Sequence, residues 1–254
     1  MVRQGWSRNY CSENLRRIRQ LFKWAASLEL IPHQAYSRLT SVEGLRRGQT
    51  EARETRPVQP VPDQLVDATL PLLPEPVGDM VRFQRLTGAR PAEVCLLRPC
   101  DVDRSGDVWV YKLPKHKTLH HGKERKVYIG PRAQDILRPY LLRKCDDYCF
   151  EPKWKRSGPR YSTDSYRRAI HRACERRWAK RKKEWEKQNP SEQFKEQLVK
   201  WSPNQLRHSA GTAIRAEFGV EHAQAILGHS NLSTTEIYAE RSQSRAIEVA
   251  RSLG

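Results

Sequence analysis

Apolar residues recur at three- and four-residue steps near the start of the chain, which is the spacing of one helical face. This pattern predicts an amphipathic helix from Ser12 to Leu28 with Ser12 as its N-cap, and a shorter helix after Pro32. The segment ETRPVQPVPDQ, with prolines at 57, 60 and 62, favours an extended connector. We therefore expect a helical piece at 1–52, a proline-rich linker at 53–63 and a larger domain at 64–254. The apolar stripe consists of Leu15, Ile18, Leu21, Phe22 and Ala25.

Glycine and proline divide the next part of the chain into short helices. The run from Asp79 to Leu86 predicts a helix that ends with Gly88 as a left-handed C-cap. Pro91 suits the first position of the following helix, which must end before Pro99. Arg90 is therefore expected at the start of a helix, held by a turn on each side.

Two runs with strand composition, 108–113 and 126–129, flank the basic segment PKHKTLHHGKER and predict a hairpin. A later helix is expected to begin at Ser162 or Thr163. Its apolar face would consist of Tyr166, Ala169, Ile170, Ala173 and Cys174. The predicted fold class is therefore mainly α with a small antiparallel β-sheet (α+β).

The segment SPNQLRHSAGT reads as the start of another helix, with Ser202 as the cap, Pro203 at the first position and Gln205 completing a capping box. The three-residue spacing places Asn204 and Arg207 on one face, near the positive end of the helix. An anion site is one interpretation, and an ordinary surface cation is the other. The buried face is expected to contain Leu206, Ala210, Ala213 and Ile214.

Near the end of the chain, Gly228 is expected to close the AQAIL helix just before His229. A second capping box, Ser233 with Glu236, predicts a short helix that carries Tyr238. A single His or Tyr in such a place is normally a packing or surface residue. Together with the arginines, however, they form a set suited to phosphoryl transfer, which needs a nucleophile and several fixed cations.

The charge of the chain indicates a polyanionic partner. Lys and Arg number 47 against 29 Asp and Glu, giving a formal net charge of +18 over 254 residues. Nucleic acid is favoured over an anionic membrane, because no apolar run approaches the roughly 18–20 residues of a membrane span. The first residues contain no apolar core of a secretory signal.

The cysteines and histidines give no sign of a metal or disulfide framework. Six cysteines occur without a CxxC pair, which is typical of reduced thiols in a cytosolic protein. His116, His120 and His121 lie close together but lack the spacing of a zinc site. No metal and no cofactor are therefore expected.

A strongly charged run, RRWAKRKKEWEKQNPSEQ, follows the predicted helix at Ser162. Alternating Lys, Arg and Glu most often forms a solvated helical face with i,i+4 ion pairs, and we favour this interpretation. Direct contact with phosphates is the alternative, because cations exceed acids locally.

Five motifs in order resemble those of the tyrosine recombinases of the phage integrase family. They are LTGARPAEVCLLRPCDVD around Arg90, the hairpin triplet HKT, LRHSAGT around Arg207, LGHSNLSTTEIYAE with His229 and Tyr238, and the helix SENLRRIRQLFKWA before the linker. The resemblance covers nearly the whole chain. It implies a recombinase catalytic domain preceded by a partial helical core-binding domain that clamps DNA.

The resemblance also implies roles for the residues. Tyr238 matches the nucleophile that forms a 3′-phosphotyrosyl link. Arg90 and Arg207 match the two guanidiniums that hold the non-bridging phosphate oxygens, and His229 matches a further donor. Glu93 resembles the supporting acid of the site.

The lysine of the hairpin acts as general acid for the departing 5′-oxygen in this family. Lys117, in HKT, is the predicted counterpart. Lys115 and Lys123 stay open as alternatives, because the register of a hairpin cannot be read from sequence alone.

Two departures from the family pattern stand out. Asn204 occupies the position of the usual His, and an amide can donate and accept hydrogen bonds but cannot take up a proton as imidazole does. We therefore expect Asn204 to position the substrate and the reaction to be slower. The piece before Pro57 is also short for a four-helix clamp, which indicates either a truncated chain or a minimal clamp with weaker DNA binding.

The implied function is site-specific recombination of double-stranded DNA, for integration or excision of a mobile element. The resemblance implies a homotetramer on paired sites, accessory DNA-bending proteins and a cytoplasmic, nucleoid-associated location. Two alternatives stay open: a type IB topoisomerase-like relaxing enzyme, and a catalytically weak or inactive DNA-binding relative.

Overall fold

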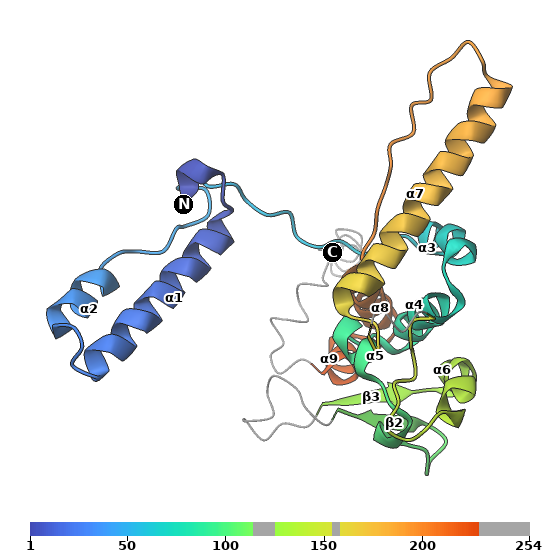
Figure 1. Cartoon of the computed structure of the whole chain (residues 1–254), viewed down its shortest axis with the longest axis horizontal. Coiled ribbons are helices and arrows are strands. Elements are labelled where there is room, and N and C mark those ends of the chain that lie inside the picture. Colours follow the sequence, from blue (N-terminus) through green and yellow to red (C-terminus); the bar gives the residue numbers. More distant parts are fainter. Residues whose placement is uncertain (114–124, 154–157, 229–254) are drawn as a thin grey trace, which may run out of the picture. The chain divides into compact units, whose positions relative to one another are not determined.

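A computed structural model describes residues 1–113, 125–153 and 158–228 of the chain (Figure 1). It contains two compact units, Met1–Pro57 and Val58–Gly254. The division falls within the proline-rich segment 53–63. Each unit is described by itself below.

The first unit is a pair of helices, α1 (Arg8–Ser27) and α2 (His33–Thr40), after a 3-10 turn η1 (Val2–Gln4). The predicted cap of α1 was wrong: Ser7, not Ser12, caps the helix, and its hydroxyl accepts from the backbone N–H of Tyr10 at 3.4 Å. A parallel β-bridge between Ser7 and Arg53 fixes this earlier start, because it places the chain in an extended conformation just before Arg8. Leu21 of the predicted stripe is exposed.

The second unit is mainly helical, with the small sheet that the sequence predicted. Figure 1 shows the long helix α7 beside α8, and α6 and the sheet at the other end of the unit. Its helices are α3 (Asp63–Thr69), α4 (Glu75–Thr87), α5 (Pro91–Leu96), α6 (Pro131–Leu137), α7 (Thr163–Gln188), α8 (Pro203–Phe218) and α9 (Val220–Leu227), with 3-10 turns η2 (Leu70–Leu72), η3 (Pro99–Asp101) and η5 (Arg138–Leu142).

The sheet has the order β1-β2-β3 and is antiparallel throughout the described residues. Its strands are β1 (Val102–Asp103), β2 (Trp109–Lys112) and β3 (Lys126–Ile129). The two predicted strands are confirmed, and Tyr111 of β2 lies opposite Val127 of β3. The short β1 was not predicted because two residues carry no alternating pattern. The hairpin connection lies outside the described residues.

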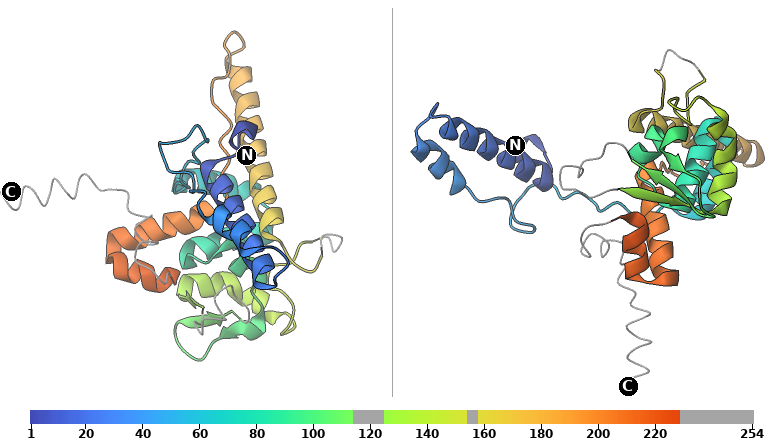
Figure 2. Two further views of the ribbon diagram at one scale, coloured as in Figure 1. Left: turned by 90° about the vertical axis from the view of Figure 1, so that its left-hand side faces the viewer. Right: turned by 90° about the horizontal axis from the view of Figure 1, so that it is seen from below.

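The core of the second unit surrounds α4. Its apolar residues Val77, Met80, Val81 and Phe83 are fully buried, and α6, α7 and α8 contact it. The predicted capping box of α8 is present, since the Gln205 side chain accepts from the Ser202 N–H at 2.9 Å. One predicted core position, Ala213, is exposed. It lies three residues beyond the buried Ala210. Figure 2 shows α8 and α9 projecting side by side from the rest of the second unit.

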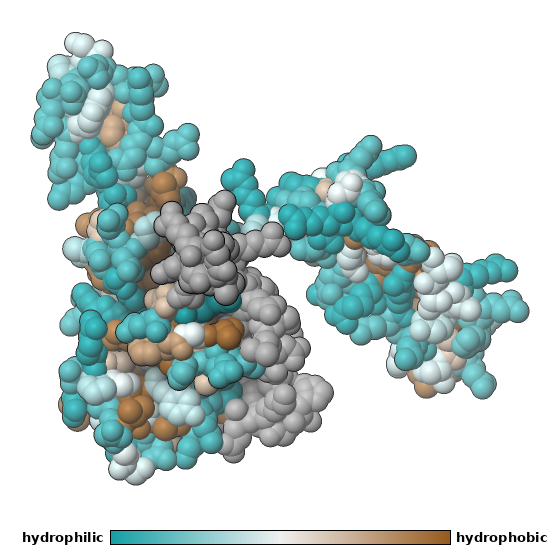
Figure 3. All heavy atoms as spheres, turned by 180° about the vertical axis from the view of Figure 1, so that it is seen from behind, coloured by the Kyte–Doolittle hydropathy of each residue, from teal (hydrophilic) through white to brown (hydrophobic). Residues whose placement is uncertain are grey.

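The charged second half of α7 is partnered by the segment that follows it. Phe194 lies against Trp178 and Trp185, with ring centroids 5.9 and 5.7 Å apart. An ion pair with i,i+4 spacing joins Lys180 to Glu184 at 3.9 Å, as expected for a solvated helical face. Seen from behind, this end of α7 is covered mostly by hydrophilic residues (Figure 3). Direct contact with phosphates stays the alternative interpretation of this run.

The six cysteines are free thiols, four of them buried. No helix within the described residues is both long and apolar enough to cross a membrane. Among these residues no cluster of potential metal ligands occurs, while His116, His120 and His121 lie outside them.

We expect even a methyl group at Gly88 to destabilise the fold. Its φ of 62° is left-handed, and an added Cβ would lie 2.8 Å from the Leu227 side chain. Gly88→Ala should therefore lower the free energy of unfolding by roughly 1–3 kcal/mol, combining backbone strain with overpacking. Urea unfolding measures this change.

Gly106→Ala is the matched control, because its φ is not left-handed and its Cβ would meet the Val108 carbonyl at an ordinary 3.6 Å. Equal stability of the two variants would contradict the account of Gly88.

Candidate active site

Arg90 lies in the turn between α4 and α5, where the sequence placed it. Gly88 ends α4 in the left-handed conformation, and Arg90 is the extended N-cap of α5. The backbone N–H of Arg90 donates to Glu93 Oε2 at 2.8 Å, and its guanidinium donates to Glu93 Oε1 at 2.7 Å. The Arg90 side chain is 44% exposed. One carboxylate thus holds both the backbone and the side chain of a solvent-accessible cation.

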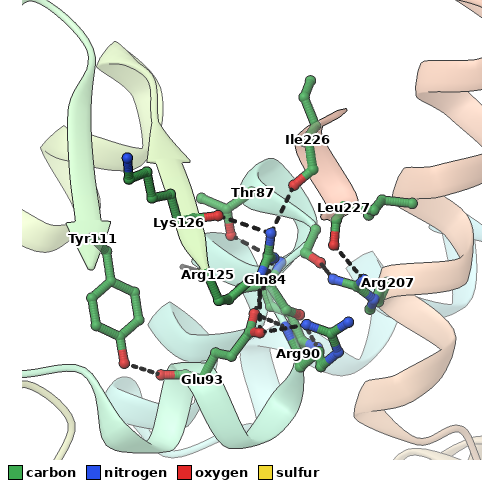
Figure 4. Close-up of polar contacts among 12 residues, drawn as sticks. Gln84, Thr87, Arg90, Glu93, Tyr111, Arg125, Lys126, Arg207, Ile226 and Leu227 are labelled. Carbon is green, nitrogen blue, oxygen red and sulfur yellow. Dashed lines mark hydrogen bonds and ion pairs between the residues drawn. The ribbon is translucent and has the colours of Figure 1, made fainter. Parts of the chain in front are cut away.

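Glu93 is buried and is shared between two arginines. Besides Arg90, it accepts from Arg125 Nε at 3.0 Å and from Arg125 Nη2 at 3.2 Å (Figure 4). Burial, the largest influence, raises the pKa of Glu93, but the hydrogen bonds and charge of Arg125 and then those of Arg90 outweigh it and hold this pKa below its ordinary value. The carboxylate is therefore ionised at neutral pH, as a residue that positions cations must be.

Arg207 joins the end of α4 to the end of α9. Its guanidinium donates to the Gly88 carbonyl and to the Leu227 carbonyl, both at 2.7 Å. The residue is 5% exposed. Gly88 lies two residues before Arg90, so Arg207 fixes the turn that presents Arg90. This contact brings together two cations that lie far apart in the sequence.

Asn204 is exposed at the start of α8, on the rim of an open pocket of about 460 Å³. The Arg90 and Arg167 side chains also line this pocket, and Arg167 pairs with Asp164. Asn204 and Arg90 therefore line the same pocket. The remaining lining residues are Pro91, Ala92, Thr163, Asp164, Ser202 and Pro203.

Sequence reasoning missed Gln84, which ties these elements together. This fully buried amide donates to the carbonyls of Ala89 and Pro203, both at 3.0 Å, and accepts from the Tyr166 hydroxyl at 3.0 Å. It therefore connects the Arg90 turn, the start of α8 and the first turn of α7. No local signal could have revealed it, because its partners are remote in sequence.

Other predicted site residues lie outside the described residues. They are Lys117, with its alternatives Lys115 and Lys123, together with His229 and Tyr238. Gly228 is described: it ends α9 in the left-handed conformation, as predicted, immediately before His229 in the sequence. The described part of the site therefore comprises Arg90, Glu93, Asn204 and Arg207. These come from two helix starts, those of α5 and α8.

Comparison with known proteins places this arrangement in a family. The sequence profile described as "Phage integrase family" matches residues 63–245. The chain belongs to the phage integrase family. Its mostly helical domain with a small antiparallel sheet, predicted from the sequence, is thereby confirmed as the tyrosine recombinase fold.

Curated tyrosine recombinases are similar to this chain at low identity. Tyrosine recombinase XerC of Shewanella sp. (strain W3-18-1) is 30% identical over 158 residues, which are 60% of this chain and 43% of that protein. XerC of Neisseria meningitidis serogroup C is 28% identical in an alignment 256 positions long, which covers 94% of this chain and 76% of that protein. The chain spans less than half the length of the Shewanella relative.

Solved structures of two integrases share the fold at low sequence identity. The Tn1549 transposon integrase in complex with a circular intermediate DNA aligns with a TM-score of 0.68 at 18% identity, covering 99% of this chain and 81% of that one. A lambda integrase dimer bound to a COC' core site aligns with a TM-score of 0.61 at 13% identity, covering 91% and 59%.

Proposed function

We propose that the chain is a site-specific DNA recombinase that cuts and rejoins strands through a 3′-phosphotyrosyl intermediate. The observation that carries this proposal is the bond between the Arg207 guanidinium and the Gly88 carbonyl, which ties two separate arginine motifs into one site. Family membership and the net charge of +18 support a DNA substrate.

The proposed reaction needs no metal and no cofactor. The Tyr238 hydroxyl gives its proton to solvent as its oxygen attacks the scissile phosphorus, the phosphorus–O5′ bond breaks, and the departing 5′-oxygen takes a proton from the Lys117 ammonium. A 5′-hydroxyl from a second strand then gives its proton to the neutral Lys117 amine as it attacks the phosphotyrosine, and the departing Tyr238 oxygen takes a proton from solvent. Both steps exchange one phosphodiester for another, so the energy of the bond is retained.

The described residues of the site supply the electrostatic part of this mechanism. Negative charge on the non-bridging oxygens is stabilised best by donors that are fixed before the reaction begins. Arg90 is fixed by Glu93, and Arg207 by two backbone carbonyls. A planar guanidinium can contact two phosphate oxygens at once, which an ammonium cannot. His229 is proposed as a further donor.

Double-stranded DNA is the proposed partner, and a homotetramer on paired sites is the proposed assembly. Integration or excision of a mobile element, accessory DNA-bending proteins and a nucleoid-associated, cytoplasmic location extend the proposal. In support of a DNA partner, the Tn1549 integrase is solved in complex with a circular intermediate DNA, and the lambda integrase dimer is bound to a COC' core site. The helix pair of the first unit is proposed as a small DNA clamp.

Asn204 distinguishes the proposal from a catalytically inactive DNA-binding relative. Its exposed amide lies by the pocket that Arg90 lines, where it can hydrogen-bond a phosphate oxygen but cannot accept a proton. We predict that Asn204→His leaves the cleavage rate unchanged or raises it by up to roughly a hundredfold, the lower end of what general-base assistance contributes. Single-turnover cleavage measures this rate.

Asn204→Ala is the companion variant, and it should cleave more slowly than the natural chain. A clear fall in rate for Asn204→His would show that the amide itself is required and would contradict the assignment.

Trapping on nicked suicide DNA tests the proposed function. Nicked duplexes made from the DNA that flanks the gene lose a short fragment after cleavage, so the covalent complex accumulates. The proposal expects an adduct that resists detergent, forms in the presence of a metal chelator and is absent with Tyr238→Phe. No adduct from the natural chain, or one that persists with Tyr238→Phe, would overturn it. Relaxation of supercoils without joining of paired sites would indicate the topoisomerase alternative.

A further inference from the structure

Arg125 is a buried cation to which the sequence analysis assigned no role. It directly precedes β3, and its side chain is 6% exposed. The guanidinium forms a two-bond fork with Glu93 of α5, and its Nη1 donates to the Ile226 carbonyl of α9 at 3.3 Å and to the Lys126 carbonyl of β3 at 2.8 Å. Figure 4 shows this side chain between the three elements.

We propose that Arg125 is a positioning residue of the phosphate site, which holds Arg90 in place through Glu93 and fixes the end of α9 against β3. This role rests on the proposed function, because it concerns how the cations of that same site are held. Arg125 itself is not proposed to touch DNA, because Glu93 and the carbonyls of Lys126 and Ile226 already engage all three nitrogens of its guanidinium.

The geometry at Glu93 gives the first argument. Both Arg90 contacts, from the backbone N–H and from the guanidinium, end on the two oxygens that the Arg125 fork also holds. A single contact would let the carboxylate rotate, whereas a planar fork fixes its plane. Removing Arg125 therefore frees the carboxylate that orients Arg90.

The end of α9 gives the second argument. Consecutive carbonyls of its last turn, those of Ile226 and Leu227, accept from Arg125 and Arg207 respectively. Gly228 then turns the chain with a φ of 63°, and a Cβ at this glycine would overlap the Arg125 guanidinium. Two buried guanidiniums thus set the point at which the chain leaves α9, one residue before His229.

Electrostatics supplies a signature that separates positioning from simple packing. The groups that face Glu93 among the described residues are Arg90 from its own helix, Arg125 from the start of β3, and the Tyr111 hydroxyl of β2, which donates to the Glu93 carbonyl at 3.2 Å. Without Arg125, the burial that raises the pKa of Glu93 is opposed by Arg90 alone. Glu93 would then take up a proton, and release Arg90, at a higher pH than in the natural chain.

The test compares Arg125→Gln and Arg125→Lys with Arg98→Gln in the full chain. Arg98 forms a similar two-bond pair with Asp101, at 2.9 and 3.1 Å, but does not line the Arg90 pocket. On suicide DNA, Arg125→Gln should slow adduct formation about a hundredfold while the Kd for DNA changes less than about threefold, because orientation rather than binding is lost. The acid limb of its pH–rate profile should move up by about one unit. Arg125→Lys keeps the charge but lacks the fork, so its rate of adduct formation should lie between those of the natural chain and Arg125→Gln.

A second readout does not depend on cleavage. In NMR spectra of protein labelled at the arginine side-chain nitrogens, the Arg90 Nε signal should shift toward the position of a solvated arginine in Arg125→Gln, and stay unchanged in Arg98→Gln. If Arg125→Gln fails to fold because it leaves an unpaired buried carboxylate, the double variant Glu93→Gln with Arg125→Gln is used instead, since it removes both charges of the buried pair. The Arg90 signal is then measured in Arg125→Lys.

The outcomes separate the two proposals. A natural chain that forms no adduct counts against the proposed function. A folded Arg125→Gln with an unchanged Arg90 signal overturns the positioning role, whatever its activity. The role is also overturned if Arg125→Gln lowers the rate, the DNA affinity and the melting temperature together without shifting the pH profile. Loss of packing alone would produce that pattern.

Discussion

Arg207→Ala should abolish detectable covalent adduct and also destabilise the fold. The guanidinium is buried and supplies the bonds to the Gly88 and Leu227 carbonyls, which the variant would leave without this donor. Losing these bonds should lower the free energy of unfolding by roughly 3 kcal/mol. Adduct formation should fall by at least about a thousandfold, because one preorganised donor to the phosphate disappears and Arg90 loses its fixed turn.

Arg207→Lys separates charge from geometry. A lysine keeps the positive charge, but its single ammonium cannot reproduce a fork that spans two carbonyls on different helices. We expect the rate of Arg207→Lys to stay within about tenfold of that of Arg207→Ala. Single-turnover trapping and urea unfolding measure the two effects. A Lys variant with natural activity would show that charge alone suffices and would contradict this account.

Arg90→Ala should have an equally large effect on the reaction with little effect on stability. Its side chain is 44% exposed, so its pair with Glu93 is screened by solvent, and Arg125 still neutralises the carboxylate. The free energy of unfolding should therefore change by less than about 1 kcal/mol. The adduct rate should fall about a thousandfold, as expected when one donor to a developing negative charge is lost.

Arg138→Ala is the control for Arg90→Ala. Arg138 is 61% exposed and also forms an i,i+3 ion pair, with Asp135, but it belongs to the turn after α6 and does not line the pocket. This control should cleave at the natural rate. The account would be wrong if both variants lost activity to the same degree, or if Arg90→Ala unfolded as readily as Arg207→Ala.

The start of α5 shows how much of the site local sequence could predict. Gly88, Pro91 and Glu93 carry signals that act over a few residues: a left-handed cap, a first-turn proline and a first-turn acid. They placed Arg90 at the start of a helix, and the structure has it there. The capping box at Ser202 located the start of α8 in the same way.

Long-range contacts escaped prediction. Gln84 and Arg125 are an amide within a helix and a cation in a basic segment, and nothing in their neighbouring residues distinguishes them. Their roles come from carbonyls of Pro203 and Ile226, which only the folded chain brings near. Ser12 was mistaken for a cap for a related reason, because the bridge from Ser7 to Arg53 starts α1 earlier than its apolar stripe does.

The central claim is that Tyr238 carries the DNA during the reaction, and mass spectrometry of the trapped complex tests it most directly. The adduct from suicide DNA would be digested with nuclease and protease, and the peptide that carries nucleotide would be sequenced. The account predicts a 3′-linked nucleotide phosphate on Tyr238 and on no other residue. A nucleotide attached to a different side chain, or joined through its 5′-phosphate, would contradict it.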